Sequence, residues 1–388
     1  MNNESYQAKT INIQGGDLSR GNVPPLLADL GDIESKTILK KLTLAHRALA
    51  ELKGVATGMP NQQILINTLP LQEAKDSSAI ENIVTTHDEI YLSDSRKQLF
   101  VSLAAKEVHA YATALREGFE QVQKSGLLTN QDIKNIQATI EQNNAGFRKL
   151  PGTALKNEQT GEIINIPPQY ADDIVNLMDD LERFINSKTQ SDLDPLVKMA
   201  VIHHQLESIH PFYNGNGRTG RIINILYLVH QGLLDSPILY LSRYINRNKS
   251  EYYRLLQRVR NSGYNLAAWE EWVLFIVTGI EETSYQTTIL VNEIKRLMQH
   301  HKAVLREQLP KIYNQDLINN LFRHPYTKIE FVMDDLQIHR ATAAKHLDAV
   351  VQIGILSKHK IGTHNYYLND ALFDLLHSVG TQQNGQND

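Results

Sequence analysis

A short stretch of this chain combines residue types suited to holding a phosphate group. Residues 209–221 read IHPFYNGNGRTGR, with apolar helical patterns on both sides of the glycines. Gly215 and Gly217 can adopt the backbone conformations that turn successive N–H groups toward an anion, and a helix N-terminus favours phosphate. Arg218 and Arg221, three residues apart in the first turn of the second helix, place two guanidinium groups on one side. The stretch therefore predicts an anion-binding loop.

His210 ends the first helical pattern, and its imidazole can exchange a proton near neutral pH. A base beside a phosphate-binding loop indicates chemistry on a nucleotide. An alternative groups His203, Glu207 and His210, which fall at i, i+4 and i+7 of one helical face and could form the metal triad of a hydrolase. That alternative leaves the glycines and arginines unexplained, and the H-E-x-x-H order of zinc proteases is absent.

Central helices are expected to position this loop. Asp194-Pro195 predicts a helix start, with an N-cap residue and a proline at the first helical position, and the helix extends to Ile209. This helix and residues 222–229 are apolar on most faces, which is typical of helices at the centre of a protein. Other segments with helical spacing are 38–52, 99–119, 129–141, 251–260, 269–280 and 292–309.

Residues 147–168 contain the best hairpin candidate, with β-type residues on both sides of a polar turn at 157–161. A two-stranded hairpin is marginal by itself in water, so we expect it to lean on the helical body or on something that it binds. An equally weighted alternative is that residues 147–168 form only a surface loop between two helices. Residues 1–30 are expected as an extended surface arm, and residues 64–71 as a short apolar segment broken by Pro70.

The C-terminal part after residue 311 has the order helix, helix, turn, helix and two short β-like runs, which suggests a winged helix-turn-helix. The second of these helices starts at Ile329, and the third covers residues 341–353. From Leu321 onward there are six Lys and Arg against seven Asp and Glu. This balance gives little support to DNA binding, and protein binding is at least as well supported. The tail after Leu376 is expected to be disordered.

The composition is that of an ordinary globular protein. With 388 residues the chain is long enough for two or three domains, and a net charge of −4 gives no general reason to expect nucleic acid as a partner. It contains no cysteine, which excludes disulfides and thiolate metal sites. Its N-terminus lacks the pattern of a signal peptide, and no apolar run approaches the length of a membrane span. We therefore expect a soluble cytoplasmic protein without a membrane partner.

The loop sequence resembles a family signature. The residues from His210 to Arg221 match the Fic motif H-P-F-x-[D/E]-G-N-G-R-x-x-R at every position except Asn214. The likeness covers about residues 30–285 and includes the hairpin, which is similar to the family's target-docking flap. On spacing alone, Ser78-x-x-Glu81 predicts a capping box. Ser77-x-x-x-Glu81-Asn82, however, resembles the family's inhibitory motif [S/T]-x-x-x-E-[G/N].

The resemblance implies a mainly α fold, namely a Fic-type helical bundle with a β-hairpin flap, followed by the winged helix-turn-helix. We place an N-terminal region with the inhibitory motif at residues 1–98 and a Fic core at residues 99–285. A connecting helix follows at residues 286–310, and the winged-helix domain with its tail covers residues 311–388.

Most Fic proteins move AMP from ATP to a hydroxyl group of a target protein. The resemblance implies that His210 is the general base and that the loop and the following turn bind the nucleotide. In this assignment Arg218 holds the β-phosphate and Arg221 the γ-phosphate. The other nucleotide-binding candidates are Glu81, Asn214, Gly215, Asn216, Gly217, Thr219, Gly220, Asn248 and Tyr253. Tyr240 and Tyr252 are further candidates for the adenine pocket, and Phe212 is expected to turn inward.

Glu81, with Ser77 and Asn82, would inhibit by pairing with Arg221 and taking its guanidinium from the γ-phosphate. Asn214 replaces the acidic residue that holds Mg²⁺ in the family, so Mg²⁺ is expected to bind weakly or through water. The flap backbone at residues 152–155 would align the target as an added strand. A homodimer is left open.

Two other functions use the same features. With Glu81 orienting a water molecule, the site could remove AMP from a modified protein, as some family members do. Alternatively, the winged helix could make the chain a transcription regulator with a nucleotide-sensing Fic domain. Salt-dependent binding to DNA would favour that second alternative.

Overall fold

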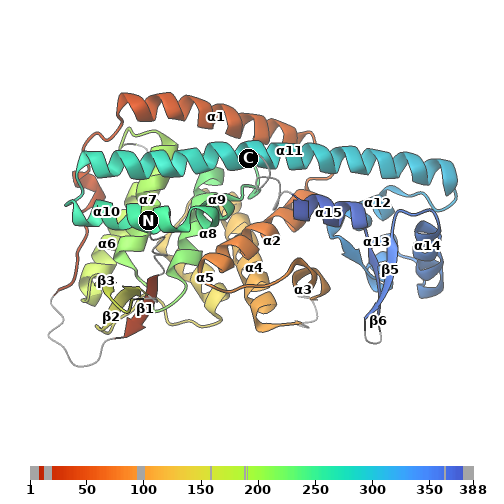
Figure 1. The fold of residues 1–388 in the computed structure, drawn as a ribbon, viewed down its shortest axis with the longest axis horizontal. Helices are drawn as coiled ribbons and strands as arrows, with labels where there is room; N and C mark the ends of the chain where they lie inside the picture. Colours follow the sequence, from red (N-terminus) through yellow and green to blue (C-terminus); the bar gives the residue numbers. More distant parts are fainter. Residues whose placement is uncertain are drawn as a thin grey trace.

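Helices dominate the structure, a computed structural model that describes residues 8–12, 20–93, 101–157, 160–187, 189, 191–361 and 364–378. The longest helix, α11 (Leu266–Gln308), runs along one side of an elongated molecule, and α1 (Lys36–Thr57) lies beside it (Figure 1). The predicted mainly α fold is confirmed. The structure thus consists of a larger helical body joined to a smaller C-terminal unit by the far half of α11.

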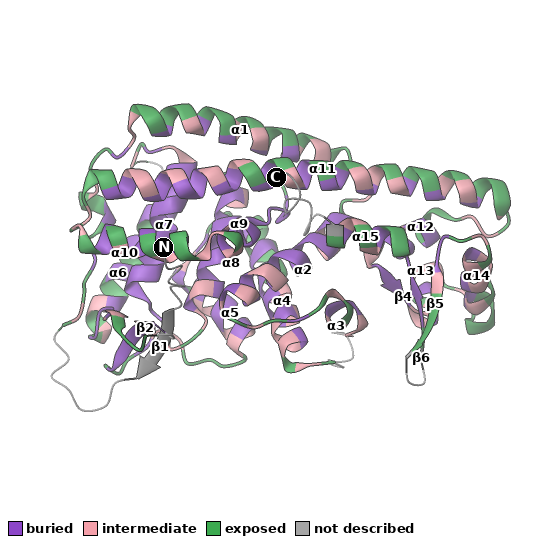
Figure 2. Cartoon of the chain, in the orientation of Figure 1, coloured by how far each residue is buried: buried purple, intermediate pink, exposed green. Residues whose placement is uncertain are grey.

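Two buried helices form the centre of the body. α7 (Pro195–Ile209) begins as predicted, because the Asp194 side chain accepts a hydrogen bond from the Leu196 N–H and Pro195 takes the first helical position. α8 (Asn216–His230) follows after the loop, and both helices are almost entirely buried (Figure 2). The helices around them are α2 (Gln63–Ile80), α3 (His87–Leu92), α4 (Leu103–Ser125), α5 (Asn130–Glu141), α6 (Ala171–Asn186), α9 (Leu241–Arg247) and α10 (Lys249–Asn261).

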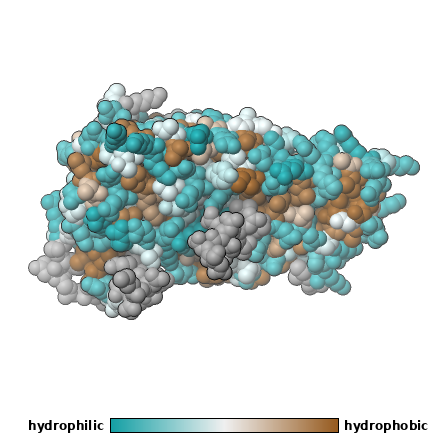
Figure 3. Space-filling view, turned by 45° about the horizontal axis from the view of Figure 1, so that its top comes forward, coloured by the Kyte–Doolittle hydropathy of each residue, from teal (hydrophilic) through white to brown (hydrophobic). Residues whose placement is uncertain are grey.

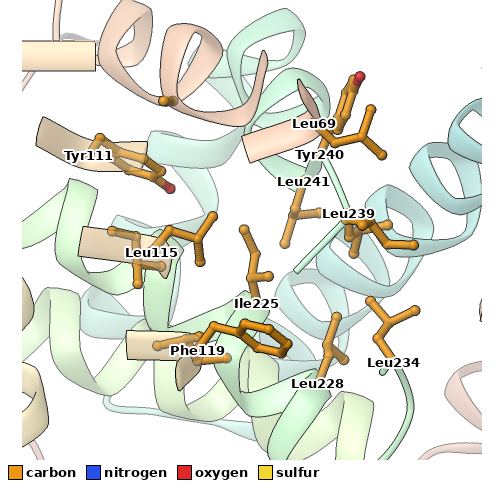
Figure 4. Close-up of a cluster of buried hydrophobic side chains, with 14 of the residues drawn as sticks. Leu69, Tyr111, Leu115, Phe119, Ile225, Leu228, Leu234, Leu239, Tyr240 and Leu241 are labelled. Atoms are coloured by element: carbon orange, nitrogen blue, oxygen red, sulfur yellow. The ribbon is translucent and has the colours of Figure 1, made fainter. Parts of the chain in front are cut away.

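An apolar cluster fixes α8 between its neighbours. Leu115 and Phe119 of α4 face Ile225 and Leu228 of α8, while Leu69 of α2 closes one side of the cluster (Figure 4). Burying a side chain of this kind stabilises the fold by roughly 1.5–3 kcal/mol. The N-terminus of α8, which carries the glycine loop, is therefore held on a rigid support.

The predicted hairpin is part of a three-stranded sheet. β2 (Thr153–Asn157) and β3 (Ile163–Asn165) pair antiparallel around the expected turn. β1 (Ala8–Asn12) pairs antiparallel with the other edge of β2, which gives the order β1-β2-β3. We expected an extended arm in this region, and the third strand was not predicted.

The C-terminal unit has the element order predicted for a winged helix-turn-helix. It contains α12 (Gln315–Arg323), β4 (Tyr326–Thr327), α13 (Ile329–Leu336), α14 (Arg340–Gln352), β5 (Ser357–Ile361), β6 (His364–Leu368) and α15 (Asp370–Ser378), with sheet order β4-β6-β5. Arg340 at the start of α14 pairs with Glu330, and Lys358 of the β5–β6 hairpin pairs with Asp348. These ion pairs lower the positive charge available to DNA.

Several predicted boundaries were wrong. Pro70 lies inside α2 and does not end it, and the segments at 269–280 and 292–309 belong to one continuous helix, α11. Ser78-x-x-Glu81 is not a capping box, because α2 ends there and Glu81 is its C-cap residue. The tail prediction after Leu376 fails for the last residues of α15, and residues 379–388 lie outside the described part. The predicted domain limits stay predictions. The limit between residues 98 and 99 also lies outside the described part of the chain.

The face shown in Figure 3 is mostly hydrophilic, with hydrophobic residues in small groups. Within the described ranges, no helix is both long and apolar enough to cross a membrane.

Candidate active site

His210 is the C-cap residue of α7 and adopts a left-handed conformation with φ 50° and ψ 59°. Its carbonyl oxygen accepts a hydrogen bond from Arg148 Nε at 2.8 Å, and Arg148 also donates to the Ile209 carbonyl. Burial, with the positive charges of Arg148 and Arg260, lowers the pKa of His210 to about 3. The imidazole is therefore neutral at pH 7, which is the protonation state that a general base needs.

Hydrogen bonds within the loop hold it in one shape. The side chain of Asn216 accepts from the Phe212 N–H and donates to the Phe212 carbonyl, both at 2.8 Å. Phe212 is fully buried against Phe147, as expected. The Tyr213 hydroxyl accepts from the N–H groups of Lys149 and Leu150, so the loop is also tied to the segment that leads into the flap.

Arg221 is almost completely buried, and its hydrogen bonds go to the segment predicted to be inhibitory. It donates to Ser77 Oγ at 2.8 Å, to the Ser77 carbonyl at 3.0 Å and to Glu81 Oε1 at 2.8 Å. Burial opposes its charge, but the Glu81 carboxylate raises the pKa of Arg221 above the ordinary value. A Cβ atom at Gly217 would collide with Glu81 Oε1, so the carboxylate lies directly against the loop. The predicted ion pair is present, whereas its inhibitory effect stays a prediction.

Arg218 has two carboxylate partners that the sequence pattern does not predict. It pairs with Glu107 at 2.9 Å and with Glu141 at 2.6 Å. Glu141 Oε1 would lie 2.6 Å from a Cβ atom at Gly215, so it also rests against the loop. Burial, with the nearby charges of Glu107 and Glu81, raises the pKa of Glu141 although Arg218 lowers it. The only sequence signal was that the helix predicted at 129–141 ends on an acidic residue.

A cavity of about 470 Å³ opens over the loop. Its lining includes these predicted residues: Glu81, Asn82, His210, Asn214, Gly215, Asn216, Gly217, Arg218, Arg221, Tyr252 and Tyr253. The flap adds Leu155 and Ile164, and α10 adds Leu256 and Gln257. The arrangement places a neutral base, a glycine loop and two arginines around one space that is large enough for a nucleotide.

Three family models match the chain: Fic/DOC family N-terminal at residues 39–120, Fic/DOC family at residues 127–228, and Protein adenylyltransferase SoFic-like, C-terminal domain, at residues 297–372. The chain contains Fic/DOC family domains. The second match ends inside α8 and contains the whole loop. The Fic resemblance stated from the motif is confirmed.

Curated relatives and solved structures agree with this family. Protein adenylyltransferase Fic from Drosophila sechellia and from Drosophila melanogaster are each 32% identical over 139 residues, which is 35% of this chain and 26% of each relative. The match thus spans about a quarter of the length of these relatives. A Fic family protein from Desulfovibrio desulfuricans G20 superposes with a TM-score of 0.52 at 20% identity, covering 86% of this chain and 96% of that one. Fic-1 from C. elegans superposes with a TM-score of 0.51 at 18% identity, and the match covers 66% of this chain and 73% of that one. These structures support the Fic fold.

Four predicted nucleotide-binding residues of this Fic protein lie outside the cavity lining. Thr219 is fully buried in α8, and Gly220 faces α7, where a Cβ atom would lie 3.3 Å from His203 Nδ1. Asn248 uses its amide to donate to the Tyr244 carbonyl. Tyr240 is buried in the apolar cluster of Figure 4. Sequence spacing does not show which face of α8, or which end of α9, is turned toward the cavity, and the nucleotide-binding role of these four residues stays a prediction.

The metal-triad alternative is wrong. No group of three or more His, Asp or Glu side chains in the described part of the chain could hold a metal ion. His203 instead stacks on Trp272, shares a hydrogen bond of 2.8 Å with the Tyr252 hydroxyl, and has its pKa lowered to about 3 by burial. Asn214, the candidate Mg²⁺ ligand, is exposed at the cavity and offers a neutral amide oxygen. Such a donor fits weak or water-mediated Mg²⁺ binding.

Glu207 lines the cavity as a buried carboxyl group, and its Oε1 atom has no hydrogen-bond partner among the described residues. Burial raises its pKa to about 7, although Arg221 lowers it. The sequence pattern indicates this residue only as a member of the metal triad. Its position three residues before His210 on α7 is what brings it to the site.

Proposed function

We propose that this Fic protein is a protein adenylyltransferase that moves AMP from ATP to a hydroxyl group of a target protein and that Glu81 inhibits it. The observation that carries the proposal is the Arg221–Glu81 ion pair inside a cavity that also contains His210 and the glycine loop. The Drosophila relatives are protein adenylyltransferases by name, which supports the reaction class. A target protein docked on the flap and a cytoplasmic location belong to the same proposal.

The mechanism follows from the neutral His210. Its imidazole takes the proton of the target hydroxyl while the hydroxyl oxygen attacks the α-phosphorus. The bond from that phosphorus to the oxygen bridging to the β-phosphate breaks, and pyrophosphate leaves. The N–H groups at the start of α8, with Arg218 and Arg221, stabilise the phosphate charge. A bound Mg²⁺ ion would add charge neutralisation, and Asn214 is the residue that would contact it.

Inhibition follows from competition for one guanidinium group. Arg221 cannot bind a γ-phosphate through the N–H that it donates to Glu81, and the carboxylate repels a phosphate that approaches Gly217. The side chain of Glu81 is 30% exposed, whereas that of Arg221 is 2% exposed. We therefore expect the glutamate to move away and the arginine to remain in place when ATP binds productively.

The reverse reaction uses the same residues and remains the second candidate. Glu81 faces the cavity, where its carboxylate could orient a water molecule toward the α-phosphorus of an AMP-modified side chain. Attack would break the bond from phosphorus to the target oxygen and release AMP and the free hydroxyl. In this case Glu81 would be required for the reaction and would not inhibit it.

Intact mass after incubation with ATP and Mg²⁺ tests the proposal. We expect Glu81→Gly to gain the mass of AMP, the wild type to gain less, and His210→Ala to gain none. A purified AMP-modified sample of the wild type, incubated without ATP, tests the reverse reaction. If the wild type loses AMP and Glu81→Gly gains no AMP mass, the proposed transfer of AMP would have to be replaced by removal of AMP.

A further inference from the structure

The edge of the flap at which a target strand is expected already has an occupant. β1 pairs with β2 through five register positions, from Ala8 opposite Asn157 to Asn12 opposite Thr153. β3 pairs with the other edge of β2. Both edges of β2 are therefore used within the chain, and the main-chain groups expected to align a target are bonded to residues 8–12.

This edge lies next to the chemistry. Leu155 of β2 and Ile164 of β3 line the same cavity as His210. Thr10, in the middle of β1, is the register partner of Leu155. The backbone of β1 therefore runs beside the flap residue that lines the cavity. An extended segment that replaced β1 in this register would pass the site in the same way, which is how strand addition presents a peptide.

β1 can leave the flap without releasing the N-terminal segment. The chain is anchored separately at residues 20–22, where Arg20 pairs with Asp173 at 2.6 Å and its carbonyl accepts from the Gln169 N–H at 3.1 Å. The Asn22 N–H donates to the Ile166 carbonyl at 2.7 Å. None of these contacts involves β2. A tethered strand competes at an effective concentration of roughly millimolar, so an outside segment must pair better than β1 does.

The register indicates what kind of partner segment would pair well. Lys156 of β2 lies opposite residue 9, which is a lysine in this sequence. Opposite charges at directly opposite positions stabilise an antiparallel pair, so a partner with Asp or Glu at this position would be attracted to Lys156. Such a segment would therefore pair with β2 better than the sequence of β1 does.

We propose that β1 is an internal occupant of the target-docking edge and that an extended target segment with Asp or Glu opposite Lys156 replaces it. The target role rests on the proposed adenylyl transfer, but the exchange of strands does not require that reaction. The partner class is an extended segment that runs antiparallel to β2 and has no proline at the positions whose N–H groups point toward β2, because those N–H groups must donate to the edge.

A reversible crosslink in the full chain tests the exchange. The chain has no cysteine, so Asn12→Cys with Thr153→Cys introduces one possible intramolecular disulfide, and opposed positions of an antiparallel pair have suitable spacing. The probes are fluorescent peptides with the sequence of residues 6–14 and the same sequence with Lys9→Glu. Binding is measured by fluorescence anisotropy in the oxidised and the reduced protein.

We expect the reduced protein to bind the Lys9→Glu peptide roughly two- to five-fold more tightly than the unchanged peptide. The oxidised protein should bind neither, while the single variant Asn12→Cys treated with the same oxidant should still bind. In a Lys156→Gln background the preference for the acidic peptide should disappear. Equal binding to the oxidised and reduced forms, or binding to neither, would overturn the proposal. Because no ATP is present, these outcomes are independent of whether AMP is transferred.

Discussion

The Arg218 guanidinium lies 2.6 Å from the carboxylate of Glu141, which itself rests against Gly215. Arg221 and Glu81 repeat this relationship at Gly217. Both arginines of the Fic motif thus carry a carboxylate that lies against a loop glycine. The two carboxylates come from different helices, since Glu81 ends α2 and Glu141 ends α5. Phosphate groups entering the loop must compete with both of them.

Replacing Glu141 by Gln should therefore strengthen nucleotide binding. The amide keeps the size of the side chain but removes a charge-assisted hydrogen bond and the repulsion of phosphate, so we expect ATP to bind about ten-fold more tightly, or about 1.4 kcal/mol. Titration calorimetry without turnover measures this in a His210→Ala background. Glu107→Gln is the matched control, because Glu107 contacts the same arginine but lies outside the cavity lining. Weaker binding by the Glu141 variant would show that Glu141 orients Arg218 for phosphate.

Asn214→Asp should lower the Mg²⁺ concentration that the protein needs. Asn214 offers one neutral oxygen at the cavity, whereas a carboxylate is the preferred oxygen ligand of Mg²⁺ in phosphate sites. We expect the Mg²⁺ concentration at the midpoint of a titration of ATP binding to fall several-fold. The affinity for ATP in the absence of Mg²⁺ should change little. An equal midpoint for Asn214→Asp and the wild type would mean that residue 214 does not contact the ion.

The loop could be predicted because local rules decide it. The glycines, the arginines and the Asp194-Pro195 helix start act within a few residues of one another, and the structure places His210 and Arg221 at one cavity. The pairing of Glu81 with Arg221 came from the resemblance to the family. No spacing rule connects residues that lie on separate helices, and the capping-box rule gave the wrong end of α2.

The parts that were missed depend on tertiary contacts. Pro70 continues α2 because neighbouring helices bury that turn, and α11 is continuous because its apolar face packs along α1 and then along the C-terminal unit. Glu107 and Glu141 meet Arg218 from two different helices. The pairing of β1 with β2 joins residues 8–12 to residues 153–157, and no local pattern predicts a partner at that distance.

The pH dependence of stability should contain a contribution from Glu207. Burial raises its pKa from 4.5 to about 7, so the folded state binds this proton more tightly than the unfolded state does. The stabilisation is complete below pH 4.5 and is lost as the pH rises to about 7, by at most about 3 kcal/mol. Glu207→Gln should remove this loss, so its free energy of unfolding should fall less between pH 5 and pH 8 in urea titrations. Glu73 is also buried, and burial raises its pKa to about 7. The free energy of unfolding of the Glu207→Gln variant should therefore still depend on pH in this range. Parallel curves for variant and wild type would contradict the assignment.

The C-terminal unit should influence the reaction through the segment that follows Glu81. The Tyr326 hydroxyl donates to Asp88 Oδ1 at 2.7 Å, and the His87 ring lies 5.1 Å from that of His377, so α3 is held by this unit. Tyr326→Phe removes one hydrogen bond to a carboxylate, which is worth roughly 1.5–3 kcal/mol, and should let the Glu81 segment move more freely. We expect AMP incorporation to rise several-fold in the wild-type background and to stay unchanged in the Glu81→Gly background. An equal increase in both backgrounds would show that the contact acts on the reaction by a route other than Glu81.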